Sequence, residues 1–144
     1  MSVKQISVFL ENKPGTLYDM TRVLAEANID MRAFSLAETS EFGIARIIAD
    51  DVYKTVAALR DAGFVSSVTD VLGVAVPDVP GGLNGVLSAL SEAQVNIEYM
   101  YAFLSGEKGG AAYMIFRVTD IAKASAALSS KGIALVSSDE ISNL

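Results

Sequence analysis

Several residue types that carry catalysis and ligation are missing from this sequence, which contains no cysteine, no histidine and no tryptophan. Disulfides and thiol chemistry are excluded, and acid–base catalysis and transition-metal binding lose their commonest side chains. Basic residues are scarce, since 11 Lys and Arg stand against 17 Asp and Glu and give a net charge of −6. Nucleic-acid binding needs concentrated positive charge, so this balance argues against a nucleic-acid partner.

Long apolar runs are missing as well. No segment of the sequence approaches the roughly 18 consecutive apolar residues of a membrane helix, and residues 1–12 lack the pattern of a secretory signal. We therefore expect a cytoplasmic protein without a membrane partner. The adjacent acids Asp50-Asp51 and Asp139-Glu140 are typical of solvated helix caps, so we expect no catalysis, no metal and no cofactor.

What the sequence does contain is an internal repeat. Residues 8–31 return as residues 74–97, which aligns Pro14-Gly15 with Pro80-Gly81. Residues 51–63 return as residues 120–132, so the second copy is longer by about three residues, which we place within 105–110. A repeat of about 70 residues has the size of a small domain and is too long for a solenoid unit. The chain is therefore predicted to be two tandem domains, residues 1–71 and 72–144.

Hydrophobic periodicity predicts the same order of strands and helices in both copies. The first copy is expected to have strands at 3–10, 31–38, 44–49 and 64–71, with helices at about 17–27 and from 52 to the glycine at 63. The second is expected to have strands at 72–76, 96–104, 111–118 and 133–137, with helices at 81–93 and 121–130. This βαββαβ order predicts two ferredoxin-like α+β domains, each an antiparallel sheet with both helices on one face. Exposed sheet edges and faces favour a homodimer.

The segment Glu-Asn-Lys-Pro-Gly-Thr-Leu at residues 11–17, followed by a helix and by Ala-Asn-Ile-Asp-Met at 27–31, resembles the signature of the ACT domain family. The second copy keeps Pro80-Gly81, Leu83 and Val-Asn-Ile at 95–97, but has Pro-Asp-Val at 77–79. The resemblance covers both copies. It implies a ferredoxin-like regulatory module, of the kind found in amino-acid biosynthetic enzymes and in free-standing tandem proteins.

The loop before the first helix has properties that suit a ligand. A glycine lets a ligand approach the backbone, and the unpaired N–H groups at a helix start favour an anion such as an α-carboxylate. Asn12 supplies hydrogen bonds, and Asp30 supplies an acceptor for an α-ammonium. A simple strand-to-helix turn with Pro14 at the first helical position is the alternative explanation. The predicted ligand-binding residues are Asn12, Pro14, Gly15, Thr16, Leu17, Asp30 and Met31 in the first copy, and Asp78, Gly81, Gly82, Leu83 and Asn96 in the second.

Two classes of function remain open. The first is a non-catalytic regulatory protein that binds a free L-amino acid at the interface of adjacent domains. The second is the regulatory small subunit of an amino-acid biosynthetic enzyme, similar to that of acetolactate synthase. Alternating Tyr99, Tyr101 and Phe103 are expected at a domain interface, with a pocket wall as the alternative.

Overall fold

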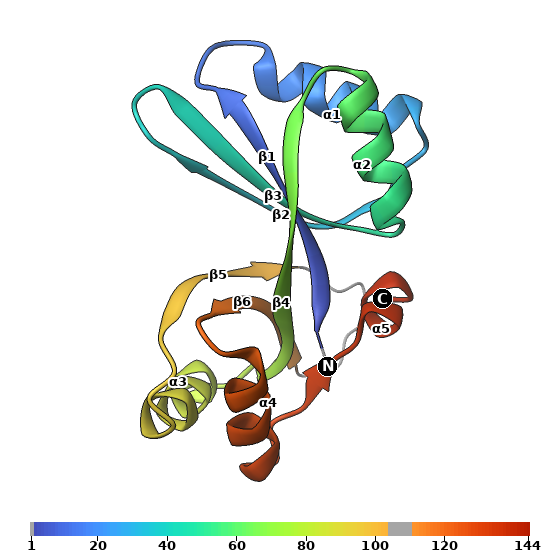
Figure 1. The fold of residues 1–144 in the computed structure, drawn as a ribbon. Helices are drawn as coiled ribbons and strands as arrows, with labels where there is room; N and C mark the ends of the chain where they lie inside the picture. The colour runs from blue at the N-terminus through green and yellow to red at the C-terminus, as the bar shows by residue number, and fades with distance from the viewer. Residues whose placement is uncertain (1, 104–110) are drawn as a thin grey trace. The chain divides into compact units, whose positions relative to one another are not determined.

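The computed structural model describes residues 2–103 and 111–144, which fold into two compact units (Figure 1). The N-terminal unit comprises Lys4–Thr69, and the C-terminal unit comprises Asp70–Leu144 together with the start of the first strand. The predicted boundary between residues 71 and 72 falls inside a strand that continues from one unit into the other. The end of the expected strand at 104 and the extra residues within 105–110 lie outside the described residues.

The N-terminal unit has the predicted βαββαβ order. Its elements are β1 (Val3–Glu11), α1 (Thr16–Glu26), β2 (Met31–Glu38), β3 (Phe42–Ala49), α2 (Val52–Asp61) and the first part of β4 (Val65–Pro77). The strand order is β2-β3-β1-β4, and β3 pairs antiparallel with both β1 and β2. Both helices cover the same face of this sheet (Figure 1).

The C-terminal unit repeats this order with one addition at its end. Its elements are the second part of β4, α3 (Gly82–Glu92), β5 (Ile97–Phe103), β6 (Ala111–Val118), α4 (Ile121–Ser130), β7 (Leu135–Val136) and α5 (Ser138–Ser142). β4 pairs antiparallel with β6 and with β7, and β5 forms the outer strand beside β6. The expected α+β architecture, two ferredoxin-like domains with antiparallel sheets, is confirmed.

The strands expected at 64–71 and 72–76 run into one another without a linker and form one continuous strand, β4, because nothing in the apolar sequence around Leu72-Gly73 interrupts an extended backbone. One detail of the predicted elements was wrong. The strand expected at 133–137 is limited to Leu135–Val136. It ends because Ser137 and Glu140 form a reciprocal capping box that starts α5.

Each unit has its own hydrophobic core between the sheet and the two helices. Alternate residues of the first strand face the helices, and the same positions are buried in both copies. Leu24 of α1 and its repeat partner Leu90 of α3 are each 1% exposed, and each packs into the core of its own unit. The opposite face of the C-terminal sheet carries the Phe103 and Tyr113 rings, whose centroids lie 5.6 Å apart.

Candidate functional site

The first helix of each unit begins at a glycine in the left-handed conformation. The helix α1 follows Gly15 at φ 89°, and α3 follows Gly81 at φ 83°. A Cβ at either glycine would meet no atom within 4 Å. Glycine is therefore favoured by the backbone angle and not by crowding, and the space beside each turn is open.

The starts of the first helices differ from those of the second helices. Neither α1 nor α3 has a side-chain cap, whereas α2 and α4 are each capped by an aspartate. The Asp51 carboxylate accepts from the Lys54 N–H, and the Asp120 carboxylate accepts from the Lys123 N–H, at 3.0 Å in both cases. An uncapped helix start leaves first-turn N–H groups and the positive end of the helix dipole available to an anion.

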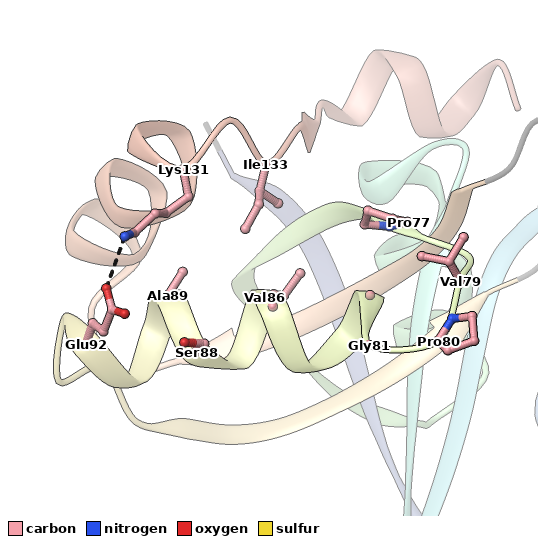
Figure 2. Close-up of a pocket in the computed structure, with 12 residues that line it drawn as sticks. Pro77, Val79, Pro80, Gly81, Val86, Ser88, Ala89, Glu92, Lys131 and Ile133 are labelled. Carbon is pink, nitrogen blue, oxygen red and sulfur yellow. Dashed lines mark ion pairs between the residues drawn. The ribbon is translucent and has the colours of Figure 1, made fainter.

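A groove runs beside α3 in the C-terminal unit (Figure 2). Its volume is about 470 Å³. It begins at the loop before α3, follows that helix, and is bounded on the other side by the turn after α4. We call it the C-terminal groove, and its lining residues are Pro77, Val79, Pro80, Gly81, Gly82, Gly85, Val86, Ser88, Ala89, Glu92, Lys131 and Ile133.

The interior of the C-terminal groove is apolar. Figure 2 shows Val86 of α3 and Ile133 pointing toward one another across it, with Val79 at the loop end. The far end is marked by an ion pair between Glu92 and Lys131, with 3.2 Å between the carboxylate oxygen and the ammonium nitrogen. Among the residues that the structure describes, no other charged side chain lines the groove.

The N-terminal unit has a smaller pocket at the equivalent place. Its volume is about 280 Å³, and it lies between the end of β1, the start of α1 and the turn after α2. We call it the N-terminal pocket, and its lining residues are Phe9, Leu10, Glu11, Lys13, Thr16, Asp19, Gly63, Phe64 and Val65. Three of these lining residues are charged, namely Glu11, Lys13 and Asp19. The repeat alignment gives the C-terminal groove Pro77, Val79 and Gly85 at the same positions.

Ion pairs cover the N-terminal pocket and the neighbouring face of α1. Lys13 Nζ lies 2.8 Å from the Glu11 carboxylate, which lowers the pKa of Glu11 and raises that of Lys13, through the hydrogen bond first and the charge second. Along the helix, Arg22 lies 3.9 Å from Asp19 and 3.3 Å from Glu26. Asp19 also places a negative charge in the first turn of α1, whereas the first turn of α3 has no acidic residue.

Most of the predicted loop residues lie at the starts of the first helices. Pro14, Gly15, Thr16 and Leu17 form the start of α1, and Gly81, Gly82 and Leu83 form that of α3. Asp78, which aligns with Asn12, lies in the loop before α3.

Asn12 is held by the β2–β3 hairpin. Its side-chain amide donates to the Glu38 carboxylate and to the Thr39 carbonyl, both at 3.2 Å. Its backbone N–H donates to the Glu41 carbonyl. These donors are already used within the unit.

The structure does not bring the other predicted residues to these loops. Asp30 and Met31 follow the C-terminal end of α1, and Asn96 follows that of α3. Each helix has 11 residues, a rise of about 16 Å. The Asp30 carboxylate accepts from Arg32 at 2.8 Å. Within one unit, therefore, Asp30 cannot hold the ammonium of an amino acid whose carboxylate binds at Gly15.

The groove residues beyond the loop were not predicted from the sequence. The signal that would have found them is a loss of charge between the copies: Lys13, Asp19 and Arg22 correspond to Val79, Gly85 and Ser88. Position 133 comes from the turn after α4, which is distant in sequence from the loop and carries no motif.

Comparison with known proteins identifies the family. The ACT domain pair family matches residues 1–144. The chain belongs to the ACT domain pair family. Both of its units are thus ACT domains, as the motif at residues 11–17 predicted, and ACT domains are regulatory modules. No curated protein matches the chain.

Solved structures agree with this membership. Protein BT0572 from Bacteroides thetaiotaomicron is 40% identical, with a TM-score of 0.92 over 100% of this chain and 98% of that one. The ligand-free regulatory subunit of aspartate kinase from Thermus thermophilus is 16% identical, with a TM-score of 0.65 over 90% of each chain. Aspartate kinase from Clostridium acetobutylicum is 11% identical, with a TM-score of 0.53 over 90% of this chain and 33% of that one. At such low identity, the two kinase likenesses concern the fold alone.

Two further observations bear on the ACT domain pair. Within residues 2–103 and 111–144, no helix is long and apolar enough to cross a membrane. In the same part of the chain, no group of acidic side chains is arranged to hold a metal ion. Asp51 serves as a helix cap, and Asp139 and Glu140 lie in the first turn of α5.

Proposed function

We propose that this ACT domain pair is a non-catalytic regulatory protein that binds a free L-amino acid at the loop before a first helix. One observation carries the proposal: in each unit the first helix starts uncapped at a left-handed glycine beside a pocket, while the second helix is capped by aspartate. Membership of a family of regulatory modules supports it.

The chemistry of the loop suits a zwitterion. The α-carboxylate binds the first-turn N–H groups of α3 that follow Gly82, since the Gly82 N–H itself donates to the Val79 carbonyl at 3.0 Å. The helix dipole favours negative charge at this place. The exposed carboxylate of Asp78, in the same loop, attracts the α-ammonium. We favour the loop at 78–83 over the loop at 12–17 because the first turn of α3 lacks the acidic residue that Asp19 provides in α1.

Exposed apolar side chains on the edge strand β2 support assembly into a homodimer. Phe34 is 36% exposed and Leu36 is 49% exposed, and β2 has a paired neighbour, β3, on one side in the strand order. A second copy that pairs with β2 satisfies its backbone groups and covers these side chains. A binding site at the interface of adjacent domains is compatible with such assembly. Light scattering at micromolar concentration tests the dimer, and a monomeric mass contradicts it.

The same exposed apolar surface favours one alternative function. A regulatory subunit of a separate biosynthetic enzyme, such as acetolactate synthase, requires an apolar surface for its larger partner. Co-purification of a much larger enzyme, together with the absence of amino-acid binding by the isolated chain, would favour this alternative.

Thermal denaturation in the presence of each of the twenty L-amino acids tests the proposal. A ligand at about 100 times its Kd stabilises the fold by about 2.7 kcal/mol, which raises Tm by several degrees. The D-enantiomers are the control, because inversion at Cα misplaces the ammonium or the side chain. If no L-amino acid at millimolar concentration shifts Tm by more than about one degree, amino-acid binding is contradicted.

A pair of matched variants tests which of the two loops binds the amino acid. Asparagine tolerates a positive φ better than other side chains do, so Gly81→Asn places a side chain over the start of α3 with little strain. Gly15→Asn does the same at α1. We expect Gly81→Asn to abolish the thermal shift and Gly15→Asn to retain it. The reverse result would assign the site to the N-terminal unit.

A further inference from the structure

The C-terminal groove is continuous with the loop that holds the proposed amino-acid site. Gly81 and Gly82 belong to the loop and also line the groove. From there the groove passes Gly85, where a Cβ would meet no atom within 4 Å, so the space above this helical position is empty. Its volume of about 470 Å³ lies within the range of about 300–1,000 Å³ that is typical of small-molecule sites.

The lining of this groove selects the chemistry of its occupant. The Val79 and Ile133 side chains present only hydrocarbon to the groove, over the core residue Val86, which is 1% exposed, and the Glu92–Lys131 ion pair lies at the far end. A polar or charged side chain placed among these three residues would lose hydration, and of the lining side chains only Ser88 and the Glu92–Lys131 pair could replace it. An apolar side chain would gain free energy from each methylene group removed from water.

The N-terminal pocket lacks these properties although it occupies the same place in the repeat. Its volume of about 280 Å³ is smaller than the 470 Å³ of the C-terminal groove. Its mouth is lined by Glu11 and Lys13, which pair at 2.8 Å, and Asp19 stands where the other copy has Gly85. An apolar side chain in this pocket would displace water from charged groups, which costs free energy.

We infer that the C-terminal groove is the side-chain pocket for an aliphatic L-amino acid of the size of leucine, isoleucine or methionine, and that each chain binds one such molecule. The inference rests on the proposed function and specifies its ligand class and its stoichiometry. The side chain enters at Val79, lies over Gly85 and contacts Ile133. The N-terminal pocket stays unoccupied by amino acid.

Isothermal titration of the full chain with L-leucine tests this inference. The expected stoichiometry is one leucine per chain. Serine, asparagine and aspartate are expected to bind at least about tenfold more weakly than leucine, because each methylene group in an apolar pocket contributes roughly that factor or more to affinity. Gly85→Leu fills the groove from a helical position with open space, and we expect it to raise the Kd for leucine at least tenfold.

Two further variants make the result decisive. Asp19→Leu is the matched control at the equivalent position of α1, and it is expected to leave the Kd for leucine within about twofold. Val79→Lys installs the residue of the N-terminal pocket at a position that is 61% exposed, so it tests the groove without disturbing the core. It is expected to weaken leucine binding as Gly85→Leu does.

The outcomes separate this inference from the proposed function. If an amino acid binds but Gly85→Leu and Val79→Lys leave its affinity unchanged, the groove is not the side-chain pocket and the proposed function stands. Two equal sites per chain, or equal affinity for serine and leucine, would also overturn the inference alone. If none of the twenty amino acids binds, the proposed function fails and this inference fails with it.

Discussion

The first helices of the two units, α1 and α3, have the same length and start but carry different surface residues. On α1 the exposed face carries the ion-paired ladder Asp19, Arg22 and Glu26. On α3 the equivalent residues are Gly85, Ser88 and Glu92, and only the last is charged. Long charged side chains therefore cover the surface of α1, whereas the short side chains of α3 leave a groove of about 470 Å³.

The cores of the two units, in contrast to the surfaces of their first helices, share equivalent buried leucines. Leu24 and Leu90 are equally buried, and so are Leu59 of α2 and its repeat partner Leu128 of α4, at 0% exposure each. These core leucines are the same in both copies, whereas the residues that face the pocket at the first helix differ.

The largest effect is expected from truncation of the shared core. Leu24→Ala and Leu90→Ala each remove a buried side chain and leave a cavity, at a cost of about 2–5 kcal/mol in the free energy of unfolding. The two values should agree within about 1 kcal/mol. Urea denaturation measures both, and a cost below about 1 kcal/mol for either variant would contradict the equivalence of the two cores.

The next effect concerns a difference between the two loops. A Cβ at Gly82 would collide with the carbonyl oxygen of Pro77, although the equivalent residue of α1 is Thr16. Gly82→Ala should therefore destabilise the chain by about 1–3 kcal/mol through a forced backbone shift. Thr16→Ala, the matched substitution, should change stability by less than about 1 kcal/mol. Equal values in chemical denaturation would mean that the two loops are built alike.

A smaller effect is expected from the charges on α1. Arg22→Ser installs the residue of α3 and removes two exposed ion pairs, which should cost no more than about 0.5 kcal/mol at low salt. Repeating the urea denaturation at high salt should reduce this difference, because exposed ion pairs are screened. A cost above about 1.5 kcal/mol would show that Arg22 has a structural role that the ladder does not explain.

The smallest effect is a pH dependence of stability that is expected in the C-terminal unit at α5. The helix α5 has no counterpart in the N-terminal unit, and the backbone and hydroxyl of Ser137 hold the pKa of the Glu140 carboxyl below its ordinary value. Because this pKa is lower in the folded chain than in the unfolded chain, Glu140 stabilises α5 above the ordinary carboxyl pKa. That contribution is lost as the pH falls through the lowered value.

Titration of the Glu140 carboxyl by NMR checks this prediction. Ser137→Ala removes the hydroxyl and is expected to return the pKa toward the ordinary value. An unshifted pKa in the unmodified chain would contradict the capping box.

Local sequence signals predicted the parts of the fold that depend on them. Pro-Gly followed by spaced leucines predicted the turn and first helix in both copies, because a left-handed residue at that point favours glycine. The length of β7 was not predictable, since Ile133 and Val136 read as a strand until the capping of α5 by Ser137 is taken into account.

The candidate site was predicted only near its motif. Adjacent residues in the loop could be grouped by sequence, whereas Asp30 is separated from the loop of its own unit by all of α1, so its role stays a prediction for a site between adjacent domains. Ile133 could not be assigned, because a residue after the second helix reaches the groove only through the packing of α3 beside the turn that follows α4.

Mapping of leucine binding by NMR tests the difference between the two units most directly. Backbone amide and methyl signals of the labelled chain would be followed during titration with L-leucine. We expect the signals of Val79, Gly81 and Ile133 to shift together with one Kd, while those of Gly15 and Phe64 at the equivalent N-terminal positions stay unchanged. Equal shifts in both units, or shifts confined to the N-terminal unit, would contradict a single site in the C-terminal groove.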